Sequence, residues 1–563
     1  MKSNEFLQVA LFVASVVAVT PPLGAFLFRV FHGEGTFLSP VLGWLERMAF
    51  RFTGIDAGEE MKWTGYAAAL LVFNIAGILL LLVIQMLQSH LPLNTEGFAG
   101  LPFALALNTA VAFVTNTNWQ AYSGEATMSY FTQMAGLAVQ NFLSAATGIA
   151  VAVAVARGLT RKSGKTLGNF WADIVRATIY VLLPLSFVFA AVMIWQGMPQ
   201  TLGHSVKATT LSGSEQVIPL GPVASQIAIK QIGTNGGGYF GANAAHPFEN
   251  PTPLTNFLQM LAIFLIPAGL TSFFGRMTGD RRQGWVLFWV MMVLFIAGFA
   301  VSWWAESLPN AALGLPVQME GKEVRFGVMN SVLFSTVTTD ASCGAVNAMH
   351  DSLSPLAGGV ALLNMLLGEV VFGGVGSGLY GMLLFVLITV FLAGLMVGRT
   401  PEYLGKKLES REIRWAVAGV LAPCVCILIG LAVACAIPAG SATLGNQGPH
   451  GFSEMFYAFA SATANNGSAF AGLGANNDFY NYALSAAMFL GRFAVIVPVL
   501  AVAGNLAGKK IAPASPGTFP TYGATFGILL ACVVVIVGAL TFFPALCLGP
   551  IAEHLLVLSG RTF

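Results

Sequence analysis

Long apolar runs separated by polar segments dominate the chain. A membrane-spanning helix requires about 20 mostly apolar residues, and ten stretches of the sequence meet this requirement. Several of them contain glycine or proline, which membrane helices tolerate. The pattern therefore predicts an all-α polytopic membrane protein with ten transmembrane helices, centred on residues 6–31, 65–88, 129–156, 172–196, 253–275, 284–304, 359–398, 415–437, 479–507 and 522–545.

The seventh apolar run differs from the others in length and composition. It covers residues 359–398 and is interrupted by FGGVGSGLYG, residues 372–381, which includes Gly374, Gly376 and Gly378. Irregular backbone at membrane depth is tolerated only where it faces protein or water. We therefore expect a broken span that borders a cavity and contributes to a gate. A close helix crossing at these glycines is the alternative.

Composition supports the membrane assignment. Hydrophobic residues make up 56% of the 563 residues and charged residues only 9%, compared with roughly 25% charged residues in soluble domains. The mean hydropathy of +0.75 agrees with this. The six cysteines lie mostly inside apolar runs, as small packing residues do. The first run is too long for a signal peptide and lacks a basic flank, so it is predicted to be a permanent span.

Lysine and arginine are distributed unequally between the two sets of loops. The loops 32–64, 157–171, 276–283, 399–414 and 508–521 hold 17 basic residues, whereas the loops 89–128, 197–252, 305–358 and 438–478 hold four. Basic residues concentrate in cytoplasmic loops. The first set is therefore predicted to face the cytoplasm, and both termini are predicted to be periplasmic.

The four outside loops share one pattern. Each contains a short apolar helix pattern that ends abruptly in small polar residues and glycine. With Asn116, Asn235, Ser342 and Asn465 as reference points, the spacings are 119, 107 and 123 residues. A recurring unit of span, short helix, polar loop and span indicates an internal repeat. The four endings are FVTNTNWQ (113–120), IKQIGTNGGGYFG (229–241), STVTTDASCGAVN (335–347) and SATANNGSAFAG (461–472).

Four such units account for eight of the ten spans. The first and last spans are then additions to a fourfold arrangement. The predicted organisation is an extra N-terminal span with a cytoplasmic loop (1–64), repeat 1 (65–165), repeat 2 (166–283), repeat 3 with its broken second span (284–411), repeat 4 (412–510) and an extra C-terminal span (511–563).

A helix too short to span, entering from outside and ending in small polar residues, is typical of a re-entrant pore helix. Its C-terminus carries a partial negative charge that favours a cation. Glycine permits unusual backbone angles in the loop beyond, so that carbonyl oxygens can line a pore. Neutral carbonyls suit a large monovalent ion, whereas a divalent ion favours carboxylates. The alternative interpretation is a set of asparagine-rich turns in ordinary loops.

Several motifs also resemble one family closely. TNTNWQ, GTNGGGYF, SCGAV, HPFENPT, GRTPEYLGKK and NNGSAFAG are similar to segments of KdpA, the potassium-binding subunit of the bacterial Kdp potassium-transporting P-type ATPase. The similarity extends from the first span to the last. It implies a member of the superfamily of potassium transporters, in the bacterial inner membrane, that selects K⁺ from the periplasm for ATP-driven high-affinity uptake. The ion would then pass through a tunnel toward the ATPase subunit.

The resemblance also implies partners and a set of filter residues. The partners would be a P-type ATPase catalytic subunit, a small single-span subunit and a further small membrane peptide. K⁺ would be the transported ion, with Gln120 lining the entrance. The implied K⁺ selectivity filter comprises Asn116, Thr117 and Asn118 from the first loop, Thr234, Asn235, Gly236 and Gly237 from the second, Ser342, Cys343 and Gly344 from the third, and Asn465, Asn466 and Gly467 from the fourth.

Four further charged residues lie near these elements. Asp340, in the third loop, either raises cation affinity or caps a turn. Glu369, before the break of the seventh run, pairs either with a cation or with Arg492. Arg492, inside the ninth run, either donates to carbonyls of the fourth filter loop and repels ions, or snorkels toward the surface. Arg399 either fixes the gate or is an ordinary positive-inside anchor.

The chain is not expected to hydrolyse ATP by itself. GLTRKSGKT (158–166) has five residues where a P-loop needs four, and no strand precedes it. The histidines are scattered and form no ligand pair. Hydrolysis would come from another polypeptide. The competing functions are a stand-alone potassium channel or ion-gradient symporter of the same superfamily, and a polytopic membrane enzyme, which would need clustered catalytic residues.

Overall fold

Ten long apolar helices form the body of the protein. The computed structural model describes residues 3–309, 314, 317–513 and 518–561. Within this part, ten helices are long and apolar enough to cross a membrane, which confirms the predicted number. They are α1 (Ser3–His32), α3 (Trp63–Met86), η2 with α6 (Thr132–Ala138, Val139–Thr160), α7 with η3 and α8 (Phe170–Arg176, Ala177–Leu182, Leu183–Trp195), α10 (Pro253–Met277), α11 (Arg281–Glu306), α14 (Ser377–Met396), α15 (Ser410–Ala436), α18 (Asp478–Ala507), and α19 with η6 and α20 (Ala524–Leu546, Cys547–Ile551, Ala552–Leu558).

Four shorter helices alternate with the spans. They contain between 10 and 16 residues, which at 1.5 Å per residue is too short for a hydrocarbon core of about 30 Å. Each lies between two spans and ends in an irregular loop, as the sequence pattern predicted. These pore helices are α4 (Phe103–Val114), α9 (Val223–Ile232), α12 (Gly327–Asp340) and α17 (Gly448–Thr463).

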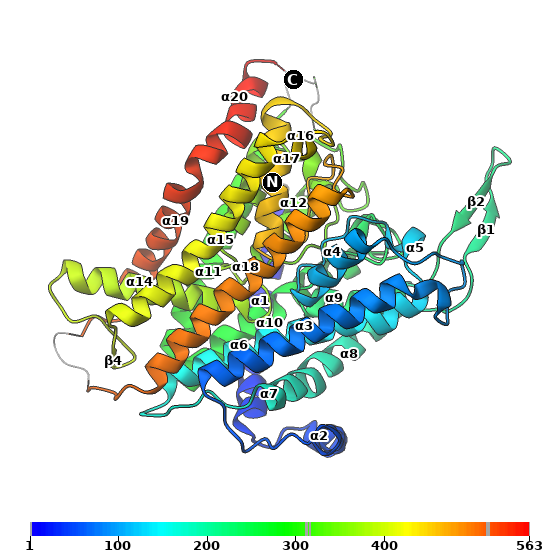
Figure 1. The fold of residues 1–563 in the computed structure, drawn as a ribbon. Helices are drawn as coiled ribbons and strands as arrows, with labels where there is room; N and C mark the ends of the chain where they lie inside the picture. The colour runs from blue at the N-terminus through cyan, green and yellow to red at the C-terminus, as the bar shows by residue number, and fades with distance from the viewer. Residues whose placement is uncertain (1–2, 310–313, 315–316, 514–517, 562–563) are drawn as a thin grey trace.

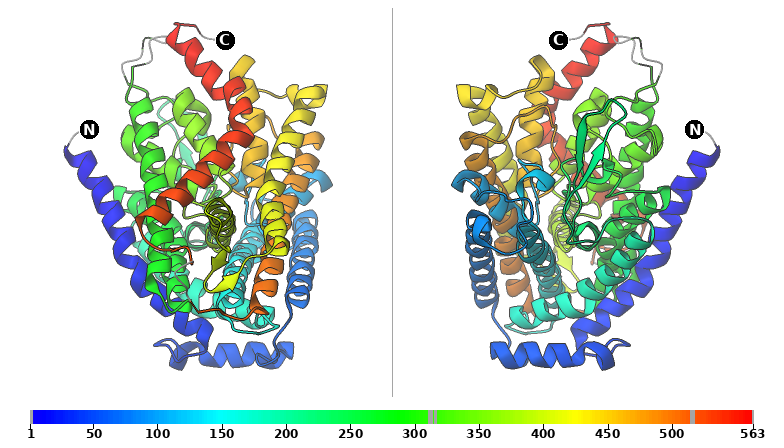
Figure 2. Two further views of the ribbon diagram at one scale, coloured as in Figure 1. Left: turned by 90° about the vertical axis from the view of Figure 1, so that its left-hand side faces the viewer. Right: turned by 90° about the vertical axis from the view of Figure 1, so that its right-hand side faces the viewer.

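The spans that follow the loops form the interior of the bundle. Helix α18 packs against α6 and α14, and α10 also contacts both α6 and α14. The apolar window of α6 is 83% buried, whereas that of α3 is only 28% buried. Helix α6 therefore faces protein, and α3 presents most of its surface outward, where a membrane helix meets lipid. The two extra spans lie on the outside, α1 along α10 and α19 against α11 and α14 (Figure 1 and Figure 2).

The seventh predicted span is broken, but at a different place from the expected one. Helix α13 (Pro355–Leu366) ends before the interruption, and α14 begins at Ser377. The non-helical segment is therefore 367–376 rather than 372–381, and Gly378 already lies in α14. Glu369 and Phe372 adopt left-handed backbone angles, with φ of 58° and 44°. Such angles in residues other than glycine persist only where the surrounding structure holds them.

Smaller elements lie at the two ends of the bundle. Helix α2 (Ser39–Thr53) lies across one end, roughly perpendicular to the spans (Figure 2). An antiparallel hairpin of β1 (Val206–Thr209) and β2 (Glu215–Ile218) projects from the body (Figure 1). The remaining elements are η1 (Gln88–His90), α5 (Gly124–Thr127), η4 (Asn243–Ala245), η5 (His350–Ser352), β3 (Glu402–Tyr403), β4 (Lys406–Lys407) and α16 (Pro438–Ser441).

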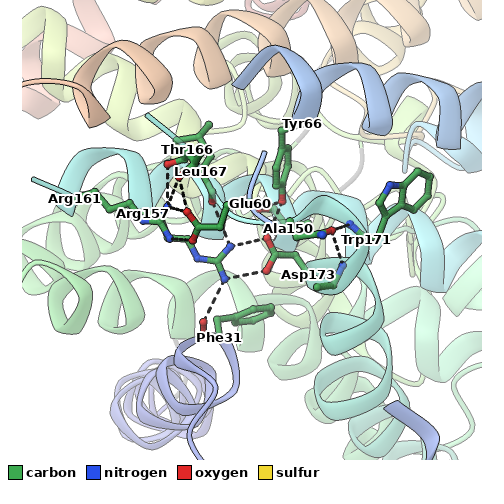
Figure 3. Close-up of polar contacts among 12 residues, drawn as sticks. Phe31, Glu60, Tyr66, Ala150, Arg157, Arg161, Thr166, Leu167, Trp171 and Asp173 are labelled. Atoms are coloured by element: carbon green, nitrogen blue, oxygen red, sulfur yellow. Dashed lines mark hydrogen bonds and ion pairs between the residues drawn. The ribbon is translucent and has the colours of Figure 1, made fainter. Parts of the chain in front are cut away.

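The basic loops meet at one end of the molecule, away from the pore-helix loops. The buried ammonium of Lys406 donates to the carbonyls of Gly158 at 3.0 Å and Leu506 at 2.9 Å, at the ends of α6 and α18. Figure 3 shows the neighbouring network, in which Arg157 bridges Asp173 at 2.6 Å and the Phe31 carbonyl at 3.2 Å. These contacts join the ends of several spans, so this end of the bundle is closed by polar bonds as well as by packing.

Candidate ion-binding site

The four pore helices end in the same backbone conformation. In each case the residue after the helix cap adopts a left-handed φ, which turns the chain sharply. These residues are Asn116 (66°), Thr234 (47°), Ser342 (45°) and Asn465 (53°). Thr234 is therefore the equivalent of the other three, and the choice of Asn235 as reference point was wrong by one residue. Asn235 resembles the reference residues of the other loops in residue type, but equivalent positions are defined by backbone conformation.

The next residue of each loop returns its amide to the pore helix. The nitrogen of Thr117 donates to the Ala112 carbonyl at 2.8 Å, five residues earlier. The same bond recurs at 2.9 Å from Asn235 to Lys230, from Cys343 to Thr338 and from Asn466 to Ser461. The four loops thus share one register, although their sequences differ.

The carbonyls of these four residues are left without a donor. Thr117, Asn235, Cys343 and Asn466 are each 0% exposed, and within the described residues no hydrogen bond reaches their main-chain oxygens. Buried carbonyls are almost always paired, because an unpaired one loses the hydration it had in water. Four such carbonyls, at equivalent positions of four loops, are candidate ligands for a dehydrated cation.

The third residues of the loops close a ring. Asn118 Nδ2 donates to the Gly236 carbonyl at 3.1 Å. A methyl group at Gly236 would collide with the Gly344 backbone nitrogen, and one at Gly344 would lie 2.6 Å from the Asn466 carbonyl. A methyl group at Gly467 would collide with the Thr117 carbonyl. The loops therefore touch in the order first, second, third, fourth and first, and we call this arrangement the loop ring.

Side chains support the loop ring from outside, and they do so unequally. Between the first and second loops, Asn116 Nδ2 donates to the Thr234 carbonyl at 3.2 Å, and Asn235 Nδ2 bonds to Asn116 Oδ1. Asn465 Nδ2 donates to Thr117 Oγ1 at 2.9 Å. These asparagine side chains therefore tie neighbouring loops to one another. This asymmetry follows from the four different loop sequences.

Gln120 and Gly237 lie at the outer edge of the first two loops. Gln120 is partly buried; its Nε2 donates to the Gly238 carbonyl at 3.0 Å, and its Oε1 accepts the Gly238 amide at 2.9 Å. A methyl group at Gly237 would lie 2.6 Å from Gln120 Oε1. Gln120 therefore ties the first loop to the second at this edge.

The broken seventh span lies directly against the loop ring. The amide of Val375 donates to Thr234 Oγ1 at 2.7 Å. A methyl group at Gly374 would lie 3.4 Å from the same hydroxyl, and one at Gly376 would collide with the Gly148 carbonyl of α6. The segment 367–376 therefore fills the space between the loop ring and the inner helices. Gly378, on the first turn of α14, packs against Gly373 of this segment.

A cavity of about 60 Å³ adjoins the fourth loop and the broken span. Its lining includes Glu369, Arg492, Thr463 at the end of α17 and Asn465 in the fourth loop. It extends between α14, α15 and α19. A volume of this size holds several waters or one ion with part of its hydration shell. The broken span therefore does border a cavity, as its glycine-rich sequence predicted.

Arg492 is only 4% exposed. It lies near the middle of α18, so the snorkelling alternative is wrong. Within the described residues it donates no hydrogen bond to the fourth loop, and its Nη2 is buried without a partner. Arg492 and Glu369 attract each other electrostatically, but no ion pair within 4 Å joins them in this part of the chain. Both charges instead face the shared cavity.

The two other singled-out charges lie outside the loop ring. Asp340 is the last residue of α12 and is 2% exposed, so it occupies a helix position equivalent to Val114 and Ile232 rather than a place in the loop. Its Oδ2 has no hydrogen-bond partner among the described residues. Arg399 follows the end of α14 and is exposed.

The described part of the chain thus combines ten candidate spans with four inserted pore helices and the loop ring. The structure is similar to that of the potassium transporter TrkH from Vibrio parahaemolyticus, with a TM-score of 0.52 over 88% of this chain and 98% of that chain. The two sequences are only 15% identical, so this similarity concerns the fold alone.

The family follows from the sequence comparison. The family model of the potassium-transporting ATPase A subunit, KdpA, matches residues 10–555, and the chain belongs to this family. A relative from Methylorubrum extorquens is 58% identical over 100% of this chain and 99% of its own length, and one from Mesorhizobium japonicum is 57% identical over 100% of both. Both relatives are named potassium-transporting ATPase potassium-binding subunits. The resemblance noted in the sequence is therefore confirmed.

Proposed function

We propose that the chain binds and selects K⁺ at the loop ring and passes it to a partner P-type ATPase subunit for ATP-driven uptake. The observation that carries this proposal is the set of four buried carbonyls, of Thr117, Asn235, Cys343 and Asn466, that have no donor among the described residues. The names of the full-length relatives support the choice of ion and of complex.

The chemistry of the loop ring favours K⁺ over other cations. Its candidate ligands are neutral main-chain oxygens, which suit a large monovalent ion with a weakly held hydration shell. The C-termini of the four pore helices lead directly into the ring and add partial negative charge. Among the last residues of these helices, Val114, Ile232, Asp340 and Thr463, only Asp340 carries a carboxyl group. A divalent ion would need several carboxylates to repay its larger dehydration cost, and the candidate ligands of the ring are main-chain oxygens.

The packing around the loop ring favours transfer to a partner over straight conduction. The segment 367–376 lies against the ring, and the inner helices contact one another beyond it. The cavity at Glu369 and Arg492 continues sideways between α14, α15 and α19. In this proposal the ion leaves along that side, and Arg492 repels it from the closed end of the bundle.

The assembly would contain the ATPase catalytic subunit, a small single-span subunit and a further small membrane peptide. The chain itself would be the non-catalytic, ion-binding component, with no ATP site. The excess of basic residues in its loops supports a cytoplasmic position for the closed end, so the pore helices and both termini would face the periplasm of a bacterial inner membrane. Exposed Arg399, on the cytoplasmic side, is then an anchor or a contact for a partner.

A stand-alone channel or ion-gradient symporter is the alternative function. Within the described residues there are two candidate spans beyond the eight of a fourfold repeat, and the segment 367–376 lies against the loop ring. Both features favour the pump subunit. Purification of the tagged chain from native membranes discriminates the two functions, because a stoichiometric ATPase supports the proposal and a nucleotide-binding regulatory ring supports the alternative.

The direct test is K⁺-stimulated ATP hydrolysis by the purified complex. Variants of the loop ring should change the K⁺ concentration that gives half-maximal activity. If substitutions at Gly236, Gly344 and Gly467 all left that concentration unchanged in an assembled complex, the ring would not be the K⁺ site.

A further inference from the structure

A buried lysine lies directly behind the second loop of the ring. Lys230, in pore helix α9, is 0% exposed, and its Nζ donates to the Gly238 carbonyl at 2.7 Å. The ammonium also lies 5.4 Å from the centre of the Phe113 ring of α4. Burying an ammonium costs free energy unless other groups compensate the charge. A buried lysine at this position therefore suggests a specific function for its charge.

A buried carboxylate accompanies the lysine. Glu249 is 1% exposed, and its Oε1 accepts the Phe240 amide at 2.6 Å. Lys230 and Glu249 attract each other, although in the described part of the chain no direct ion pair joins them within 4 Å. The lysine holds the carbonyl of Gly238, and the glutamate holds the amide two residues later. The two charged side chains therefore hydrogen-bond to the two ends of the segment 238–240.

Lys230 is also connected to the inner part of the same loop. Its main-chain carbonyl accepts the amides of Asn235 at 2.9 Å and Gly236 at 3.3 Å. The Gly238 carbonyl, in turn, is shared by Lys230 Nζ and Gln120 Nε2. The same residue thus fixes the start of the second loop through its backbone and the end of that loop through its side chain.

These contacts decide which carbonyls are available to an ion. The Gly238 oxygen is saturated by an ammonium and an amide, whereas the Asn235 oxygen has no donor within the described residues. In the second loop, the Asn235 carbonyl is therefore available to an ion, whereas the Gly238 carbonyl is held by hydrogen bonds to Lys230 and Gln120.

We propose that Lys230 and Glu249 form a charge clamp that sets the position of the second loop and thereby the discrimination between K⁺ and other alkali cations. This inference rests on the proposed function of the loop ring. Lys230 is a positioning residue, since it acts on the ion through Gly238 and the loop backbone. A relaxed second loop changes the distance from the Asn235 carbonyl to the centre of the ring, and ring dimensions govern selectivity.

The competing explanation is that Lys230 and Glu249 only stabilise the fold. A double variant distinguishes this explanation from the proposed effect on ion selection. Changing Lys230 alone leaves a buried carboxylate uncompensated, which destabilises the protein whatever its function. K230M/E249Q removes both charges at similar volume and leaves no unpaired charge. The purified complex is assayed by K⁺- and Rb⁺-stimulated ATP hydrolysis. We expect the KM for K⁺ to rise about fivefold or more, the preference for K⁺ over Rb⁺ to fall, and the maximal rate to stay within about twofold.

The matched control is a second buried pair. Lys322 Nζ lies 2.7 Å from Glu306 Oε2, with side-chain exposures of 1% and 0%, and neither residue touches the loop ring. K322M/E306Q should leave the KM for K⁺ and the ion preference unchanged. A K230M/E249Q complex with the KM and ion preference of the unmodified protein would overturn the charge clamp.

Two further variants complete the test. If K230M/E249Q does not assemble, K230R keeps the charge but replaces the single ammonium on Gly238, so a raised KM supports the clamp and an unchanged KM overturns it.

Gly236→Asp separates this inference from the proposed function. An unchanged KM in Gly236→Asp contradicts the loop ring as the K⁺ site, whereas a raised KM there together with unchanged clamp variants contradicts the clamp alone.

Discussion

The amide of Val375 donates to the hydroxyl of Thr234 at 2.7 Å and joins the broken seventh span to the second loop of the ring. The two residues are 141 positions apart in the chain. Thr234 is also the left-handed residue that ends pore helix α9. The backbone that forms the candidate K⁺ site and the backbone that closes the space beside it are therefore in direct contact, so a movement of one has to be accommodated by the other.

Thr234→Val tests this contact. Valine keeps the shape of threonine but leaves the buried Val375 amide without its acceptor, at a cost of about 1–3 kcal/mol. We expect a lower maximal rate of K⁺-stimulated ATP hydrolysis by an assembled complex. Thr234→Ser retains the hydroxyl and serves as the control. A Thr234→Val complex as active as the unmodified one would show that the bond does not matter for turnover.

Gly236→Asp should weaken K⁺ binding and relax discrimination against Rb⁺ or Na⁺. Gly236 has a φ of 78°, and any side chain there meets the backbone of Gly344. The aspartate would add both bulk and a carboxylate to a neutral ring. We expect the KM for K⁺ in the ATPase assay to rise about tenfold or more, equivalent to ~1.4 kcal/mol of binding free energy.

Gly213→Asp is the control for backbone strain. Gly213 lies in the turn of the projecting hairpin and also has a positive φ, 82°, but a methyl group there would have no neighbour within 4 Å. Its substitution should leave the K⁺ dependence unchanged. Equal effects of the two substitutions would mean that strain, rather than the loop ring, explains the result.

Arg492→Ala should impair uptake while the protein still inserts into the membrane. The substitution removes the positive charge from the cavity that Arg492 shares with Glu369 and Asn465, and ionisable groups at membrane depth are usually functional. Uptake of K⁺ by cells that depend on this transporter measures the effect, and immunoblots of membranes measure insertion. Arg492→Lys, which keeps the charge, should retain more uptake. Normal uptake by Arg492→Ala would assign the residue a role in packing only.

His450 predicts a stability loss in alkaline solution. It lies at the start of α17, where its Nδ1 is 2.9 Å from Glu553 Oε1 of α20 and its Nε2 is 3.1 Å from Asp351 Oδ1. Burial by itself lowers the pKa of His450, but the bonds to Asp351 and Glu553 outweigh burial and raise that pKa to about 10. Glu454 lies in the same cluster.

The direction of the effect follows from linkage. Because the pKa is raised above the usual value of about 6.5, the stabilisation is complete below that value and is lost as the pH rises toward about 10. Thermal unfolding of the purified protein should therefore occur at lower temperature as the pH increases through this range. His450→Gln should flatten the dependence, whereas substitution of the exposed His204 should not. An unchanged pH profile in His450→Gln would contradict this assignment.

The spans and pore helices were predictable because their signals are local. A run of about 20 apolar residues has few alternatives to a membrane helix, and the abrupt change at residues 113–120 indicated a helix too short to cross. The four endings also identified most residues of the loop ring, including Gly236, Gly344 and Gly467. The register failed by one residue in the second loop, because TNGGG offers two polar residues and only the backbone angle distinguishes Thr234 from Asn235.

Several buried polar contacts could not be predicted from the sequence, and they share one property. The bonds from Lys230 to Gly238 and from His450 to Glu553 depend on how loops and helices fold over one another. A lysine inside the apolar pattern of α9 was a usable signal, since charges at membrane depth rarely lack a role. Glu249 gave no comparable signal, because its burial is decided entirely by tertiary packing.

Local sequence patterns were sufficient to predict the class of protein, the ten spans, the four repeats and the family. Hydrophobic run length, small polar endings and motif identity are properties of neighbouring residues. Three other features became visible only in the folded chain: which oxygens lack a donor, where the broken span lies, and that Arg492 lines a cavity instead of the surface. Those features arise where segments more than a hundred residues apart meet, and hydrogen-bond partners over such distances are set by packing in three dimensions.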